Sequence, residues 1–402
     1  MNILLVCNKF PFPSLDGGAL ASYNMVKGLV EAGNKVDLLA MNTSRHFSFN
    51  DTSGIDIKGM GRVVSVNIDN SFSYFGFFCN FLFSSIPYNA GLYDNSRFRL
   101  ALAGMLREEA YDIVQLEGLY LLPYVETIRE NTVAGISYRA HNVEHIIWGT
   151  YKKREKSRFR KFYLNELQKR VRNYEQNFIN SYDLLATVTE TDLEVLNSMG
   201  NEKPSIVTPF GMSVNEFPET RQNHNDNIFL QYIGALDWLP NIESLNWLVE
   251  KVWTVVKDKY PGLKFFVAGR NAGDSLVRKL TEKGIDFIGE VENSKDFLCQ
   301  NSIFIVPLFS GSGIRVKIIE AMFMGKPIIA TSFSISGIPA EHGEHILLAD
   351  NEHAFIRCID QLLTDQGYAK SLGMNAKNLA HNYFNNSTIT GELTDFYKKH
   401  VI

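Results

Sequence analysis

The stretch 307–341, PLFSGSGIRVKIIEAMFMGKPIIATSFSISGIPAE, decides the fold. A short apolar run at 303–307 predicts a buried strand, and a loop of alternating Ser and Gly follows at 310–313. Apolar residues then recur at helical spacing until a Gly-Lys-Pro segment of the kind that ends helices. A second apolar run at 328–331 completes a strand–loop–helix–strand unit. Such units build parallel α/β sheets.

Two positively charged residues begin the predicted helix. A helix start leaves backbone N–H groups without partners inside the helix, so it readily binds an anion. Arg315 and Lys317 lie in the first turn, where positive charge opposes the helix dipole at a cost of roughly 0.3–1 kcal/mol. A bound anion would remove that conflict, so the segment predicts a phosphate or diphosphate site. The alternative is that both cations are solvated and that Glu320 pairs with Lys317.

The composition limits the classes of protein to which the chain can belong. Its 402 residues are 45% hydrophobic, enough for about two or three domains. A net charge of −4 gives no sign of a nucleic-acid partner. The four cysteines form no Cys-x-x-Cys pair, so we expect free thiols in a reducing compartment. The chain starts without the basic segment of a signal peptide, and no apolar run reaches the roughly 18 residues of a membrane span. We therefore expect a cytoplasmic protein.

The first half of the chain begins with a strand–helix–strand pattern. Apolar runs at 3–7 and 35–41 flank a helical pattern at 19–32, which predicts a parallel sheet with a right-handed crossover. The dinucleotide-binding pattern Gly-x-Gly-x-x-Gly does not follow the first strand, which disfavours a nicotinamide-dependent enzyme. Gly17 and Gly18 stand there instead. They form either a plain turn or a loop that brings backbone close to a phosphate.

A histidine follows a later strand of the same half. Apolar runs at 112–117 and 136–139 predict two further strands, and the second leads into His141 and Asn142. Ligands of open α/β sheets bind at the carboxyl ends of the strands, so His141 is a candidate for ligand contact. The alternative is a surface histidine or a capped core residue. His145 we assign to a supporting or structural role.

Two segments of the first half each allow two interpretations. Residues 72–86 are rich in aromatic side chains and carry no charge, and burial against the sheet is favoured over a short helix at a membrane interface. The segment 151–175 has ten Lys or Arg residues against three Glu, with an apolar spacing that predicts one amphipathic helix. A solvated basic face is the usual explanation. Attraction to anionic lipids or to a diphosphate-linked acceptor is the alternative.

A polar stretch without periodicity, 218–227, predicts a linker between two domains. We place the boundary so that the first domain comprises 1–212 and the second 213–384. Strand and helix patterns alternate in the second domain as well, which predicts another parallel sheet.

The order of Gly loop, Arg-x-Lys pair, Glu-Ala, Gly-Lys-Pro and apolar strand resembles the donor-binding segment of retaining glycosyltransferases of family 4, the group 1 family. The likeness extends over nearly the whole chain. It implies the GT-B fold, in which two Rossmann-like α/β domains face each other across a cleft and a last helix, about 385–402, packs back on the first domain. The family commonly has two glutamates with seven residues between them. Here Ser312 takes the first place, as in a subgroup with a Gly-Ser-Gly-x-Arg-x-Lys-x-x-Glu motif.

The resemblance also implies roles for individual residues. Arg315 and Lys317 would stabilise the donor diphosphate and replace an Arg and a Lys that the family commonly has after the first strand of its second domain. Glu320 would hold the ribose hydroxyls, and His141 would orient the donor sugar. The implied donor-binding positions are Gly17, Gly18, Asn142, Gly234, Gly289, Val291, Gly311, Ser312, Gly313, Gly337 and Ile338.

These implications describe a retaining glycosyltransferase that moves a sugar from a nucleotide diphosphate sugar to a carbohydrate or lipid-linked acceptor, in the synthesis of cell-surface polysaccharide or glycoconjugate. No Asp-x-Asp motif is present, so we expect neither a metal nor another cofactor. No carboxylate is identified near His141 as a nucleophile, which favours front-side attack assisted by the departing phosphate. A sugar-nucleotide epimerase of the same fold and a catalytically silent binding protein are the alternatives. Peripheral contact with an anionic membrane, on its inner face, would suit a lipid-linked acceptor.

Overall fold

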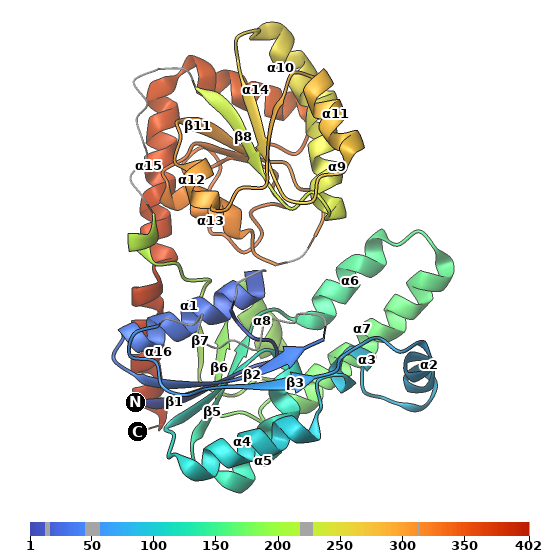
Figure 1. The fold of residues 1–402 in the computed structure, drawn as a ribbon, viewed down its shortest axis with the longest axis vertical. Coiled ribbons are helices and arrows are strands. Elements are labelled where there is room, and N and C mark those ends of the chain that lie inside the picture. Colours follow the sequence, from blue (N-terminus) through green and yellow to red (C-terminus); the bar gives the residue numbers. More distant parts are fainter. Residues whose placement is uncertain (13–16, 45–56, 218–227, 312, 402) are drawn as a thin grey trace. The chain divides into compact units, whose positions relative to one another are not determined.

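The computed structural model describes residues 1–12, 17–44, 57–217, 228–311 and 313–401 (Figure 1). The chain forms two compact units: unit 1 comprises Met1–Gly211 with Asn386–Ile402, and unit 2 comprises Met212–Asn385. The division falls one residue before the predicted domain boundary between 212 and 213. The predicted linker at 218–227 is outside the described residues.

Unit 1 is built on a parallel sheet that has seven strands in the described part of the chain, in the order β3-β2-β1-β4-β5-β6-β7. The order reverses direction between β1 and β4, and open α/β sheets bind ligands at such a switch point. One edge strand was not predicted from the sequence, because its outward residues are polar or only half-buried and its apolar run is short. The strands are β1 (Asn2–Cys7), β2 (Lys35–Thr43), β3 (Val63–Ile68), β4 (Ile113–Glu117), β5 (Gly135–Ala140), β6 (Leu184–Thr187) and β7 (Ser205–Val207).

Helices cover both faces of this sheet, as the continuous apolar strands require. Alternate residues of β1 enter two different cores: Leu4 and Val6 pack with the helices of one face, and Ile3 and Leu5 with those of the other. The helices of unit 1 are α1 (Gly17–Glu31), α2 (Tyr74–Phe83), α3 (Tyr88–Gly91), α4 (Ser96–Glu108), the 3-10 helix η2 (Leu119–Tyr124), α5 (Val125–Asn131), α6 (Glu144–Arg154), α7 (Arg158–Phe178), α8 (Glu190–Ser198) and α16 (Asn386–Val401).

The last helix, α16, packs against α1 on one face of the unit 1 sheet. Gly28 of α1 allows the close approach, since an added Cβ there would lie 2.5 Å from the Asn386 side chain. Further along, the Tyr397 hydroxyl donates to Gln115 Oε1 of β4 at 2.7 Å and contacts Ser137 Oγ of β5 at 2.9 Å. The C-terminal segment is therefore part of the unit 1 core.

The basic segment forms two helices where the sequence pattern predicted one. α6 ends at Arg154, Glu155 adopts an extended backbone, and α7 begins at Arg158. The two helices pack on each other as a hairpin (Figure 1), and Lys152 of α6 donates to Gln168 of α7 at 2.6 Å. Residues 152–158, KKREKSR, contain no apolar side chain, so hydrophobic periodicity could not locate the break.

The aromatic segment is not buried against the sheet, and that prediction was wrong. None of the residues of α2 is fully buried. The helix instead rests on α7 through one side only, with Phe77 and Phe81 against Tyr163 at ring-centroid distances of 5.4 and 6.0 Å. No helix in the described ranges is long and apolar enough to cross a bilayer.

Unit 2 repeats the plan with a parallel sheet of six strands in its described residues, in the order β10-β9-β8-β11-β12-β13. The strands are β8 (Phe229–Ile233), β9 (Phe265–Ala268), β10 (Asp286–Gly289), β11 (Ser302–Val306), β12 (Ile328–Ala330) and β13 (Leu347–Leu348). The helices are the 3-10 helix η3 (Val214–Glu216), α9 (Leu239–Trp247), the π-helix η4 (Leu248–Trp253), α10 (Thr254–Lys259), α11 (Asp274–Glu282), α12 (Ser294–Leu298), α13 (Val316–Phe323), α14 (Glu352–Thr364) and α15 (Gln366–Tyr383).

Candidate active site

In unit 2, the candidate site residues gather where the parallel strands end. The loop after β11 contains Gly311 and Gly313, whose φ angles of 120° and 76° favour glycine. An added Cβ at Gly311 would also lie 2.5 Å from the Trp238 ring. Ser312, between them, is outside the described residues. The glycines therefore let the backbone turn tightly in front of α13.

Arg315 occupies the position just before α13 and is held by its surroundings. Its side chain donates a hydrogen bond to the Gly313 carbonyl, and its guanidinium lies 5.3 Å from the ring centroid of Phe333. The residue is only 7% exposed. The alternative of a solvated arginine is therefore wrong. The loop and the aromatic ring together fix a positive charge at the start of a helix.

Lys317, two residues further on, points toward the end of β8. Its Nζ donates to the Ile233 carbonyl at 3.0 Å and lies 3.4 Å from Asn241 Oδ1 of α9. Burial, together with the neighbouring charge of Arg315, lowers the pKa of the Lys317 ammonium to about 7. Among the described residues no carboxylate lies within ion-pair distance of it. A negatively charged ligand beside it would raise that pKa again.

Glu320 does not pair with Lys317, so the surface ion pair considered from the sequence is absent. Its carboxylate is 8% exposed and accepts from Ser294 Oγ, with both oxygens 3.1 Å from that hydroxyl. Burial raises the pKa of Glu320, and the hydrogen bond from Ser294 opposes that rise. Sequence reasoning missed Ser294, because a serine at the start of the short helix α12 gives no signal of its partner in α13.

Further candidate residues of unit 2 lie at the ends of neighbouring strands. Gly234 directly follows β8, and Gly289 ends β10 with a φ of 85°. Val291 is half-buried two residues later. Gly337, with a φ of 82°, and the buried Ile338 belong to the loop after β12. Because the strands are parallel, their carboxyl ends share one edge of the sheet, the edge at which such folds bind ligands.

In unit 1, His141 directly follows β5 and contacts a buried carboxylate. Its Nε2 lies 2.7 Å from Glu117 Oε2, at the end of the adjacent strand β4. Arg139 donates to the same oxygen at 3.1 Å and Ser22 at 3.0 Å, while Gln115 donates to Oε1 at 2.5 Å. We call these five residues the His141 cluster.

The charge state of Glu117 fixes the orientation of His141. Burial alone would raise the pKa of this carboxyl, but the charges of Arg139 and His141 and their hydrogen bonds outweigh it and lower the pKa to about 2. Glu117 is therefore ionised at neutral pH and accepts hydrogen bonds only. It follows that Nε2 of His141 carries a proton, while the ring remains 22% exposed on its other side.

Sequence reasoning identified no carboxylate near His141 as a nucleophile, and it missed Glu117, the buried carboxylate that contacts the imidazole. The contact depends on the strand register, in which Glu117 of β4 pairs with Arg139 of β5, two residues before His141. A carboxylate opposite an arginine at the ends of two buried parallel strands indicates a polar cluster, not a pair of core residues.

The remaining candidates of unit 1 differ in their surroundings. Gly17 and Gly18 form the first turn of α1 and not a loop before it. Asn142 is half-buried beside His141. His145 has a structural contact: its Nδ1 lies 2.5 Å from Glu175 Oε2 of α7, which joins the start of α6 to its neighbour. In the described part of the chain, no three His, Cys, Asp or Glu side chains are grouped as metal ligands.

Sequence comparison relates the chain to glycosyltransferases. Residues 227–365 match the family model described as "Glycosyl transferases group 1". An uncharacterized 44.6 kDa protein in the cps region of Klebsiella pneumoniae is 26% identical over 282 residues, which cover 66% of this chain and 69% of that protein. An uncharacterized glycosyltransferase of Methanocaldococcus jannaschii is 25% identical over 232 residues, 56% of this chain and 55% of that protein.

Comparison with solved structures covers the whole chain. Sucrose-phosphate synthase from Thermosynechococcus elongatus superimposes with a TM-score of 0.70 at 16% identity, over 99% of each chain. HepE of Anabaena in complex with UDP gives a TM-score of 0.66 at 13% identity, over 99% of this chain and 100% of that one. At such identities the likeness shows the fold, which is GT-B. With this fold and a group 1 glycosyltransferase domain at 227–365, the protein is a glycosyltransferase.

Proposed function

We propose that the protein is a retaining, metal-independent glycosyltransferase of family 4 that uses a nucleotide diphosphate sugar as its donor. The observation that carries the proposal is the placement of two cations at the start of α13, the buried Arg315 and the half-buried Lys317. Glycosyl transfer from such a donor builds negative charge on the departing diphosphate. Fixed positive groups and helix-start N–H groups in a site that excludes water stabilise that charge without reorganisation.

The nucleotide side of the donor fits the remaining groups of unit 2. The carboxylate of Glu320 accepts from Ser294 and has further acceptor capacity on both oxygens, which suits the paired hydroxyls of a ribose. The solved structures of HepE with UDP and with UDP-glucose have this fold and support a nucleotide sugar as the ligand class. We propose that the backbone near Gly289 and Val291 binds the base of the nucleotide.

The His141 cluster favours front-side departure of the leaving group over a covalent intermediate. Glu117 is the carboxylate nearest to His141 in the described residues, but its oxygens accept from four side chains and it is almost fully buried. A carboxylate in this state is not available as a nucleophile. We therefore assign His141 to contact with the donor sugar and the departing phosphate to assistance of the attack, with retention of configuration.

The acceptor we propose is a growing cell-surface polysaccharide or glycoconjugate, carbohydrate or lipid-linked. The relative from Klebsiella pneumoniae, described as a protein in the cps region, supports this assignment.

The test is a donor assay with the full chain. The protein is incubated with uridine, guanosine and adenosine diphosphate sugars, and both free nucleoside diphosphate and the sugar are analysed. We expect nucleoside diphosphate to appear with one donor and the released or transferred sugar to keep its anomeric configuration. An altered sugar on an intact nucleotide would indicate an epimerase. Binding without any turnover, with acceptor extracts present, would indicate a binding protein, and either result would overturn the proposal.

A further inference from the structure

The aromatic helix α2 displays an apolar face that no described part of unit 1 covers. Tyr74, Phe75, Phe78 and Leu82 are 85%, 79%, 60% and 52% exposed. At about 100° per residue these four positions fall within one arc of the helix surface. Single exposed apolar residues are ordinary, but a contiguous group of this size marks a site of interaction.

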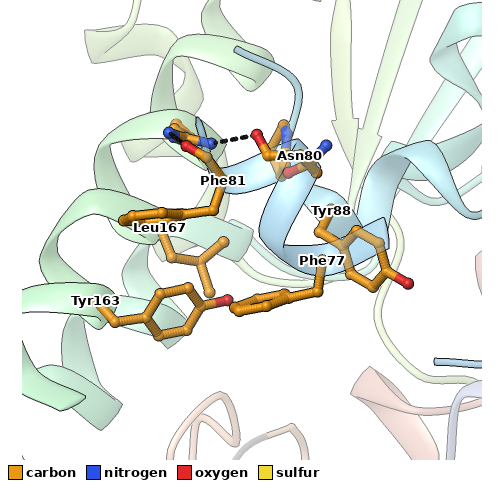
Figure 2. A pocket seen from close by; sticks show the side chains of 8 residues that line it. Phe77, Asn80, Phe81, Tyr88, Tyr163 and Leu167 are labelled. Atoms are coloured by element: carbon orange, nitrogen blue, oxygen red, sulfur yellow. Dashed lines mark hydrogen bonds between the residues drawn. The ribbon is translucent and has the colours of Figure 1, made fainter. Parts of the chain in front are cut away.

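The opposite side of α2 is anchored firmly, so the exposed face is not an unfolded or loosely attached segment. Figure 2 shows Phe77 and Phe81 turned toward Tyr163 and Leu167 of α7, around a small pocket. Arg170 of α7 donates to the carbonyls of Asn80 and Phe81 at 3.2 and 2.6 Å, so these two carbonyls in the last turn of α2 have hydrogen-bond partners. Ser73 caps its start by accepting from the Gly76 N–H. The structure thus holds the aromatic face outward.

The apolar surface continues onto α7. Phe159 and Phe162 are 90% and 63% exposed. Phe159 lies one helical turn before Tyr163, which contacts Phe77, so Phe159 is on the face of α7 that meets α2; Phe162 directly precedes Tyr163 in the sequence. We call the exposed side chains of Phe72, Tyr74, Phe75, Phe78, Leu82, Phe83, Ile86, Phe159 and Phe162 the aromatic patch.

Positive charge surrounds this patch on the side of the α6–α7 hairpin. The exposed cations of the hairpin tip alternate with the phenylalanines of α7, and in the described residues none of them forms an ion pair: Lys153, Lys156, Arg158, Arg160 and Lys161. The one acidic residue of the tip, Glu155, is half-buried and accepts the Ser157 N–H at 2.8 Å. In Figure 1, α2 and the hairpin extend from the same side of unit 1.

We propose that the aromatic patch and the hairpin cations form a docking surface for an anionic phospholipid bilayer. Aromatic side chains enter the boundary between headgroups and acyl chains, and lysine and arginine beside them attract the acidic headgroups. A second copy of the chain or another protein would cover the patch equally well. Such a partner would, however, leave the like charges of the tip uncompensated unless it carried a matching acidic surface. The absence of acidic exposed side chains within the tip favours the bilayer. This surface goes beyond the proposed reaction and does not depend on the donor site in unit 2.

The experiment is flotation of the full chain with vesicles. Vesicles of phosphatidylcholine containing about 30% phosphatidylglycerol are compared with vesicles of phosphatidylcholine alone. We expect the protein to float with the anionic vesicles and to be released as ionic strength rises. The variant Phe75→Ser/Phe78→Ser should lower the partition coefficient at least about tenfold, because two large apolar side chains lose their burial. The variant Arg158→Glu/Arg160→Glu/Lys161→Glu should lower it by about fivefold or more for each charge.

Matched controls separate the patch from general stickiness and general charge. Leu100→Ser/Val133→Ser removes two equally exposed apolar residues of unit 1, and Lys58→Glu/Arg97→Glu/Lys283→Glu makes the same change of net charge at scattered positions. Both controls should bind like the original chain. Equal losses in the controls, or no flotation with anionic vesicles at excess lipid, would overturn the proposal. A chain that does not float but forms a dimer, which Phe75→Ser/Phe78→Ser dissociates, would show that the patch is a protein interface and would also overturn it.

Discussion

Glu117 and His141 lie at the ends of adjacent parallel strands, with Oε2 of the carboxylate 2.7 Å from Nε2 of the imidazole. Glu117 ends β4, one of the two strands at the switch point of the unit 1 sheet, and Arg139 of the next strand binds the same carboxylate oxygen. The imidazole is therefore held in one orientation by a buried anion whose own charge is stabilised by an arginine. A histidine that is held in this way presents one fixed face of its ring to a ligand.

The first prediction concerns acid stability. The pKa of Glu117 is lowered from 4.5 to about 2, so its ionisation contributes stability above pH 4.5 that is lost as the pH falls toward 2. By linkage this contribution is about 3 kcal/mol. The free energy of unfolding of Glu117→Gln should be lower by about that much at pH 7. It should also fall less steeply than that of the original chain between pH 5 and 3. Urea unfolding at several pH values measures both effects.

The matched control is Glu109→Gln, which removes an exposed partner of Lys35. This substitution should lower the free energy of unfolding by less than about 1 kcal/mol and should leave its pH dependence below pH 5 unchanged. Equal stability of Glu117→Gln and the original chain at pH 7 would mean that the amide replaces the carboxylate fully and that its charge does not matter.

The second prediction concerns Lys317 and pH. Its pKa of about 7 means that the free protein loses this charge as the pH rises from 6 to 9. A bound diphosphate favours the charged form and raises the pKa, so binding takes up a proton near pH 8 and affinity falls as the pH rises. Calorimetry with a nucleotide sugar, in two buffers of different ionisation enthalpy, detects the proton. Lys317→Met should abolish the uptake while keeping a similar side-chain volume.

The third prediction concerns Arg315. Arg315→Ala should weaken binding of the nucleoside diphosphate by about 1.5–3 kcal/mol, the range for a charge-assisted hydrogen bond. Arg278→Ala, at an exposed position of α11, is the control and should bind normally. Unchanged affinity of Arg315→Ala in calorimetry would place the diphosphate elsewhere.

The fourth prediction concerns Glu320. Glu320→Gln preserves the shape of the side chain but removes the ionised acceptor, so the fold should persist and most of the transfer activity should disappear. Ser294→Ala tests the support of this carboxylate and should cause a smaller loss. If Glu320→Gln turned over donor at the original rate, a role in holding ribose would be excluded.

The fifth prediction separates His141 from the nucleotide site. His141→Ala should reduce turnover much more than affinity for the nucleoside diphosphate, since we assign the imidazole to the sugar alone. His145→Ala is its control: it breaks the contact with Glu175 and should lower thermal stability with little change in turnover of the folded protein. Parallel losses of turnover and affinity in His141→Ala would contradict the assignment.

Local patterns predicted much of the architecture. The apolar runs around α13, and those of β1, β2, β4 and β5, stand out because buried parallel strands need uninterrupted hydrophobic residues. They placed His141, Arg315, Lys317 and Glu320 at the ends of strands or the start of a helix. The edge strand β3 escaped notice, because an edge strand has fewer buried positions and a weaker signal.

Partners across long sequence distances were beyond such patterns. Glu117 lies 24 residues from His141 and Ser294 lies 26 residues from Glu320, so their contacts depend on register and packing. The break between α6 and α7 and the outward face of α2 also depend on packing, so local patterns did not predict them. Apolar residues in α2 satisfied the rule for a buried segment, yet the sheet was already covered by other helices.

The hydrogen bonds of Tyr397 have a consequence for biosynthesis. This residue lies five positions before the end of the printed chain, and its hydroxyl binds Gln115, which in turn holds Glu117. A ribosome completes all of unit 2 before it makes α16, so until then one face of the unit 1 sheet lacks the side chains that Leu393 and Tyr397 add to its core. Unit 1 therefore completes its core last, although most of its residues are the first to be made.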